Sequence, residues 1–160
     1  GDTFVADYSE GEIVSVLAHE VTHYQEHHIW WLVLWQSIIT VVLFSIFHLI
    51  YPALYEFAGF AHLHDIAAFP LFVLIFTVIS FLLNPVGAAI SRYFERRADH
   101  GALELNRDPE TFISVMAQFC NRQLSVAYPH PIIEWYKYSH PSPGNRIKFA
   151  EKWRDARQDA

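Results

Sequence analysis

Two long runs of apolar residues dominate the pattern of this chain. Residues 29–51 and 66–83 contain no Lys, Arg, Asp or Glu, and the second run stays uncharged as far as Ser91. Runs of this length and polarity are typical of helices that cross a membrane. The alternative is two core helices of a soluble protein, but a chain of 160 residues has little interior in which to bury both on every side. We therefore predict two transmembrane helices that form a hairpin.

Helical signals also mark the regions on either side of this hairpin. Ser9 and Glu12 match a capping box, which predicts that a helix begins at Glu10 and extends over residues 10–28. Further helices are expected over residues 86–105, over residues 109–124 with Phe112, Met116, Phe119 and Cys120 on the buried side, and after Pro143, with residues 125–139 forming a loop. The predicted fold class is mainly all-α, with residues 1–160 as one domain.

The distribution of charge gives the hairpin an orientation. All eleven Lys and Arg residues follow position 90, whereas residues 52–65 between the runs have none. By the positive-inside rule the connecting loop lies outside, and residues 86–160 form a cytoplasmic helical part on the same side as the N-terminal helix. The basic residues form no basic patch of the kind that binds nucleic acid, so no nucleic-acid partner is expected.

His19, Glu20 and His23 form an H-E-x-x-H motif in the predicted N-terminal helix. Because residues four apart share one helical face, the two imidazoles can bind a single zinc ion. Glu20 then becomes the candidate general base, which removes a proton from the attacking water. The motif predicts a metal-dependent hydrolase, provided that the chain supplies a third ligand.

Glu95 is the candidate third ligand, and Asp99 lies one helical turn after it. Both belong to the helix that follows the second apolar run, and a hairpin returns this helix to the side of the His pair. Asp99 is expected to accept a hydrogen bond from a ligand imidazole and so to fix its orientation. Taken alone, the segment also fits an exposed helix with local Glu–Arg pairs.

Other histidines allow different interpretations. His48 lies inside the first apolar run, where it could face a polar cavity, although a hydrogen bond between packed helices is the simpler explanation. His62, His64 and Asp65 in the connecting loop could form a second metal site, but such groups in an exposed loop are usually only hydrated.

Several segments together resemble a known family. They are Val16-Leu17-Ala18-His19-Glu20 through His23 and His28, Ser91-Arg92 with Phe94-Glu95 and Ala98-Asp99, and Ser139-His140-Pro141 with Arg146. They are similar to the integral-membrane zinc metallopeptidases of the type I CAAX prenyl protease kind, the sterile-24-like endopeptidases. The resemblance implies a membrane-embedded, zincin-type helical fold, and one Zn²⁺ per chain held by His19, His23 and Glu95. It further implies that His140 stabilises the oxyanion and that Arg146 binds the substrate backbone.

The chain departs from this family in two respects. Thr22 stands where most relatives have Gly, which bears on how closely a neighbouring helix can approach the motif. The family's upstream transmembrane helices and its substrate-aligning strand are not found before the motif. We therefore expect these 160 residues to be the C-terminal catalytic portion of a larger multi-pass protein.

The leading hypothesis is a membrane-embedded zinc endopeptidase whose active site lies on or near the cytoplasmic face. Its partners would be a peptide or protein substrate and the lipid bilayer, with processing either of the CAAX type or in membrane-protein quality control. A His-rich membrane protein that binds or transports divalent metal is the alternative, and an inactive scaffold is a third possibility. The sequence does not choose the substrate or the oligomeric state.

Overall fold

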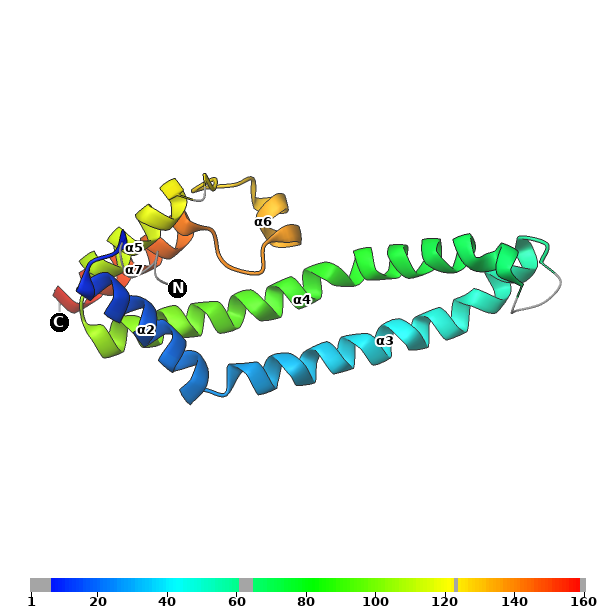
Figure 1. Cartoon of the computed structure of the whole chain (residues 1–160), viewed down its shortest axis with the longest axis horizontal. Coiled ribbons are helices and arrows are strands. Elements are labelled where there is room, and N and C mark those ends of the chain that lie inside the picture. The colour runs from blue at the N-terminus through cyan, green and yellow to red at the C-terminus, as the bar shows by residue number, and fades with distance from the viewer. Residues whose placement is uncertain (1–6, 61–64, 123, 159–160) are drawn as a thin grey trace.

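The computed structural model describes residues 7–60, 65–122 and 124–158, and every regular element within these ranges is a helix. In chain order they are α2 (Glu10–Gln25), α3 (His28–Phe57), the 3₁₀ helix η1 (Ile66–Ala68), α4 (Phe69–Asn106), α5 (Pro109–Arg122), α6 (Pro131–Lys137) and α7 (Pro143–Gln158). Helices α3 and α4 form a long antiparallel hairpin, and α2, α5 and α7 gather at one end of it (Figure 1). The predicted all-α class is confirmed.

Helix α2 begins where the capping box places its start. The Glu12 backbone N–H donates to Ser9 Oγ at 3.4 Å, and the Ser9 N–H donates to Glu12 Oε2 at 2.9 Å. The helix ends at Gln25, three residues before the predicted end at His28. His27 adopts a left-handed conformation with φ of 55°, and α3 starts at the next residue. The chain therefore changes direction between the metal motif and the first apolar run.

The hairpin helices are longer than the apolar runs predicted. Helix α3 continues through Pro52, and α4 continues through Pro85, so the helices predicted over residues 66–83 and 86–105 are one helix of 38 residues. Proline inside a helix removes one backbone hydrogen bond and often ends the helix. Helices in apolar surroundings tolerate that loss when neighbouring groups compensate.

The apolar side chains of the hairpin mostly face outward. Only 6% of the most apolar stretch of α3 is buried, and 17% of that in α4. Leu43, Ile75 and Ile79 form a narrow core between the two helices. A core helix of a soluble protein is buried on most of its surface, so this exposure argues against that alternative. Within the described residues, both helices are long and apolar enough to cross a membrane.

A compact helical group covers the C-terminal half of α4. Its core consists of Ala102, Leu103, Phe112, Val115, Met116 and Ala150, contributed by α4, α5 and α7. Phe112 and Met116 are buried as predicted, whereas Phe119 and Cys120 are only half-buried. The packed group fixes α2 and α4 relative to each other.

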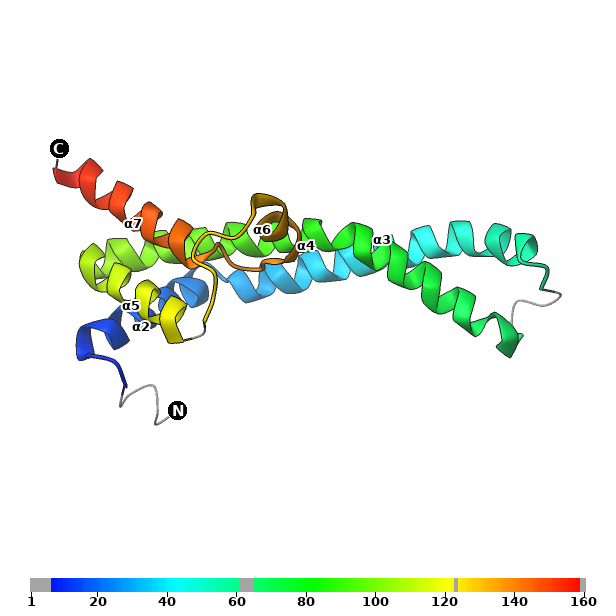
Figure 2. The ribbon, with the colours of Figure 1, turned by 90° about the horizontal axis from the view of Figure 1, so that it is seen from above.

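The prediction of a loop over residues 125–139 is wrong at its centre, where α6 forms. Pro131 occupies the first turn of α6, and His130 caps it by accepting from the Ile132 N–H at 3.3 Å. Helix α6 lies beside α4 (Figure 2). Arg92 of α4 donates to the Tyr138 carbonyl at 2.5 Å, which ties the segment leading to residue 140 to the same helix as Glu95.

Helices α2 and α4 approach closely where Thr22 meets Gly101. A Cβ atom added at Gly101 would clash with three side-chain atoms of Thr22. The bulk that Thr22 adds to α2 is therefore accommodated by a glycine on α4. This contact lies between the two helices that carry the predicted metal ligands.

Candidate metal centre

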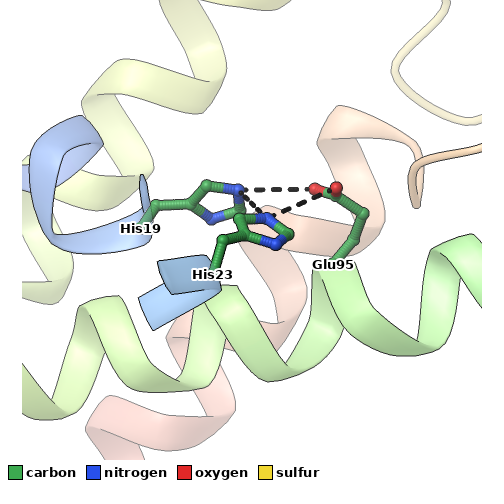
Figure 3. Close-up of side chains that lie close together, drawn as sticks. All are labelled: His19, His23 and Glu95. Atoms are coloured by element: carbon green, nitrogen blue, oxygen red, sulfur yellow. Dashed lines mark hydrogen bonds and ion pairs between the residues drawn. The ribbon is translucent and has the colours of Figure 1, made fainter. Parts of the chain in front are cut away.

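Three predicted ligands come together between α2 and α4. His19 and His23 project from one face of α2 toward Glu95 of α4 (Figure 3). His19 Nε2 lies 3.1 Å from His23 Nε2 and 3.4 Å from Glu95 Oε2, and His23 Nε2 lies 3.5 Å from Glu95 Oε1. Among the described residues this is the one group of three His, Cys, Asp or Glu side chains whose ligand atoms lie within 4.8 Å of one another.

The spacing of these atoms fits a single zinc ion. Ligand atoms about 2.0–2.2 Å from a tetrahedral zinc lie about 3.3 Å from one another. The observed separations of 3.1, 3.4 and 3.5 Å bracket this value. Glu95 Oε2 is also buried without a hydrogen-bond donor, which is costly unless a cation completes its environment. Two imidazoles and one carboxylate form a ligand set that catalytic zinc uses, with a fourth position left for water.

His19 is supported from behind by a buried acid. His19 Nδ1 lies 3.0 Å from Asp99 Oδ1, and the guanidinium of Arg146 forms two hydrogen bonds with the Asp99 carboxylate, one of 2.9 Å from Nε. Burial alone would lower the pKa of His19, but the neighbouring carboxylates of Asp99 and Glu95 raise the pKa to about 9. The acid that the sequence predicted behind a ligand imidazole therefore lies behind His19.

Arg146 occupies a different position from the one its implied role suggests. It lines the cavity beside the metal centre, but its guanidinium is paired with Asp99, whose side chain is 2% exposed. Through this pairing Arg146 holds the carboxylate that contacts His19. Contact with a substrate backbone remains a prediction.

His23 is supported by a residue to which sequence reasoning assigned no role. His28 Nδ1 lies 3.0 Å from His23 Nδ1, and His28 is 1% exposed. Burial and the neighbouring His19 charge lower the pKa of His23. A spacing of five residues does not share a face in a continuous helix, so only the turn at His27 brings these rings together.

An open cavity of about 460 Å³ is lined by two of the three candidate ligands, His19 and Glu95. Glu20 and His140 both line it, together with Tyr138 and Arg146. His140 Nε2 lies 3.3 Å from Glu95 Oε1, and its side chain is 58% exposed. The cavity thus brings the candidate base and the candidate oxyanion donor beside the ligands, with room for a peptide.

The other histidines considered as ligands lie apart from this centre. His48 is exposed on α3 and lines a shallow hollow with Thr40, Phe44 and Ser45. It belongs to no group of potential ligands within the described part of the chain. His62 and His64 fall outside the described residues.

Comparisons with known proteins agree with the geometry. The chain is 31% identical to the protein named Uncharacterized metalloprotease YhfN of Bacillus subtilis (strain 168), over 99% of this chain and 39% of that protein. It is 29% identical to CAAX prenyl protease 1 of Saccharomyces cerevisiae, over 91% of this chain and 36% of that protein. The crystal structure of S. mikatae Ste24p superposes on 93% of this chain and 38% of its own with a TM-score of 0.75, at 27% identity.

The chain therefore spans about two fifths of the length of these relatives. The model of one family, Peptidase family M48, matches residues 2–154, which include every residue assigned to the centre and its cavity. With its fold and these matches in agreement, this chain belongs to peptidase family M48.

Proposed function

We propose that the chain is the catalytic part of a membrane-embedded, zinc-dependent endopeptidase. The observation that carries the proposal is the set of three donor atoms from His19, His23 and Glu95, separated by 3.1–3.5 Å beside an open cavity. Membership of a metallopeptidase family supports the same conclusion. The spacing supports zinc as the metal and one ion per chain.

The chain's own residues supply the remaining parts of the reaction. A zinc ion held by these ligands would lower the pKa of water and polarise the scissile carbonyl. Glu20, on the cavity wall, takes a proton from the attacking water and passes it to the leaving amine. His140 donates a hydrogen bond to the oxyanion of the tetrahedral intermediate. Asp99 holds His19 in the tautomer that leaves Nε2 free to bind metal.

The protein is proposed to be an integral membrane protein with several spans. Helices α3 and α4 meet the length and composition of membrane spans. Trp30, Trp31 and Trp35 at the start of α3 are 72%, 51% and 40% exposed, as in the aromatic belt of a membrane interface. The absence of basic residues between the spans supports an active site near the cytoplasmic face.

The substrate is proposed to be a peptide or protein presented at that face. One relative is named CAAX prenyl protease 1, which suggests processing of a C-terminal CAAX segment. Turnover of membrane proteins is the other reading of the same site. Cleavage assays distinguish the two: CAAX processing predicts that a farnesylated CAAX peptide is cut faster than the same peptide without its lipid.

The central experiment replaces Glu20 by Gln in the full-length protein. Loss of the carboxylate should abolish cleavage of a peptide, whereas the ligand set is untouched and zinc should remain stoichiometric. The matched control is Glu10→Gln, at an exposed glutamate in the first turn of the same helix. If Glu20→Gln cleaved at the normal rate, the mechanism assigned here would be wrong.

Metal binding without proteolysis is the competing function, and Glu95→Ala separates the two. In the peptidase, loss of the third donor should remove zinc and activity together. A binding or transport site built around His48 would keep its metal in this variant. Among the described residues His48 belongs to no group of three potential metal ligands, which disfavours that alternative.

A further inference from the structure

A chain of polar contacts runs from His23 away from the cavity. His28 contacts His23 through Nδ1 and lies 2.9 Å from Glu26 Oε2 through its other nitrogen, Nε2. Arg97 of α4 donates to the same Glu26 oxygen at 2.5 Å. His28 is 1% exposed and packs on the ring of Phe94, with centroids 4.8 Å apart. A fully buried imidazole with both nitrogens engaged is held in one orientation.

The contacts permit only one consistent arrangement of protons when His23 binds a metal. His23 then uses Nε2 as the ligand atom, so its Nδ1 carries the hydrogen and donates it. His28 Nδ1 must accept that hydrogen, which leaves the hydrogen of His28 on Nε2, where Glu26 Oε2 accepts it. Each donor in this series of contacts thus meets one acceptor.

We infer that His28 is a positioning residue for the metal ligand His23, with Glu26 and Arg97 holding it in place. This inference rests on the proposed zinc site and deepens it. His28 fixes the tautomer and the ring plane of His23, so that Nε2 points at the metal before the metal arrives. Without the Nδ1 acceptor, His23 is free to rotate or to adopt the tautomer that cannot bind through Nε2.

The local fold explains how His28 reaches this position. Helix α2 ends at Gln25, and the left-handed His27 turns the chain. His28, the first residue of α3, is thereby placed in contact with the His23 ring. Glu26, between the two helices, joins α4 through Arg97. The support of His23 is therefore built from the junction where the metal motif meets the first apolar helix.

The two imidazole ligands are supported in parallel ways. His19 contacts Asp99, which pairs with Arg146, and His23 contacts His28, whose partner Glu26 pairs with Arg97. The first support is a carboxylate, and the second is an imidazole ring backed by a carboxylate. In each case a carboxylate held by an arginine determines where the ligand's Nδ1 hydrogen points.

The test measures zinc affinity of the full-length protein in detergent, by competition with a chromophoric zinc chelator. His28→Phe keeps the ring volume and removes the acceptor, and should weaken zinc binding by about 10–100-fold. His28→Gln retains an acceptor oxygen and should recover most of that loss. His100→Phe is the matched control at an exposed histidine of α4, and should bind zinc as the wild type does.

A second readout follows the hydrogen itself in zinc-loaded protein labelled with ¹⁵N-histidine. The Nδ1–H signal of His23 should be protected from exchange in the wild type and in His28→Gln, and lost in His28→Phe. Equal zinc affinity in His28→Phe and wild type would overturn the inference and leave the proposed function standing. Equal losses in the Phe and Gln variants would also overturn it, because the acceptor would then be irrelevant. A wild type that bound no zinc would instead refute the proposed function itself.

Discussion

Replacing Gly101 by Ala should force apart α2 and α4, the two helices that carry the candidate metal ligands. An alanine Cβ at this position would clash with Cβ, Oγ1 and Cγ2 of Thr22. Thr22 is 3% exposed, and its hydroxyl donates to the Ala18 carbonyl at 2.9 Å, so the side chain has no room to rotate away. The added methyl group can be accommodated only if α2 moves away from α4.

The expected change in the free energy of unfolding of Gly101→Ala follows from two opposing effects. Exchange of Gly for Ala in a helix interior favours folding by about 1 kcal/mol. Overpacking costs about 1–3 kcal/mol, and a clash that reaches a Cβ atom belongs at the upper end. The net loss is then about 2 kcal/mol, which lowers Tm by about 4–8 °C in a domain of this size. In a Thr22→Gly background the clash is gone, and the same change should raise Tm by about 2–4 °C.

The assay is a double-mutant cycle on thermal unfolding of the detergent-solubilised protein, together with zinc affinity. The coupling between positions 22 and 101 should be about 3 kcal/mol. Gly87→Ala is the control on the same helix, because its Cβ would meet only Ile39 Cδ1 at an ordinary 3.7 Å, and it should stabilise the protein. If Gly101→Ala raised Tm and left zinc affinity unchanged in the otherwise native chain, the close approach described here would be refuted.

Three further predictions concern charged groups. Because the pKa of His19 is raised to about 9, zinc must displace its proton, so affinity should fall about tenfold per pH unit between pH 8 and 7, with proton uptake by the buffer seen in calorimetry. Asp99→Asn leaves the Arg146 guanidinium with no anionic partner and should lower stability by about 3–5 kcal/mol, measured by thermal unfolding. A backbone hydrogen bond from Ser9 lowers the pKa of Glu12. The ionised Glu12 therefore adds to the free energy of unfolding above pH 4.5, and this stabilisation is lost as the pH falls through the lowered pKa. Glu12→Gln should remove this acid dependence from unfolding curves.

The grouping of the three candidate ligands was predictable because helical spacing is local. His19 and His23 share a face of α2 by sequence spacing alone, and Glu95 followed from the need for a third donor on the returning helix. The contact of Asp99 with His19 followed from its position one turn after Glu95. In these cases a short-range pattern and the requirements of zinc chemistry were enough.

The features that were not predicted depend on contacts between distant segments. Helix α6 is held by hydrogen bonds from Asn84 and Arg92 to its backbone carbonyls, and no local signal reports such partners. The role inferred for His28 depends on a left-handed residue at position 27, where a histidine gives no turn signal as strong as glycine would. Residues 66–83 and 86–105 were expected as separate helices, yet α4 continues through Pro85, which lies between these ranges.

Because α4 is one continuous helix, its length gives the distance of Glu95 from the hydrocarbon layer of a membrane that it crosses. Glu95 follows Phe69 by 26 residues, which is about 39 Å along an upright helix. If Phe69 lies at the outer edge of a hydrocarbon layer about 30 Å thick, Glu95 lies about 9 Å past the inner edge. An extended peptide covers that distance in about three residues. Under the proposed function, a substrate anchored in the same bilayer would be cut within a few residues of its anchor, because the length of α4 sets how far the candidate ligands stand from the lipid.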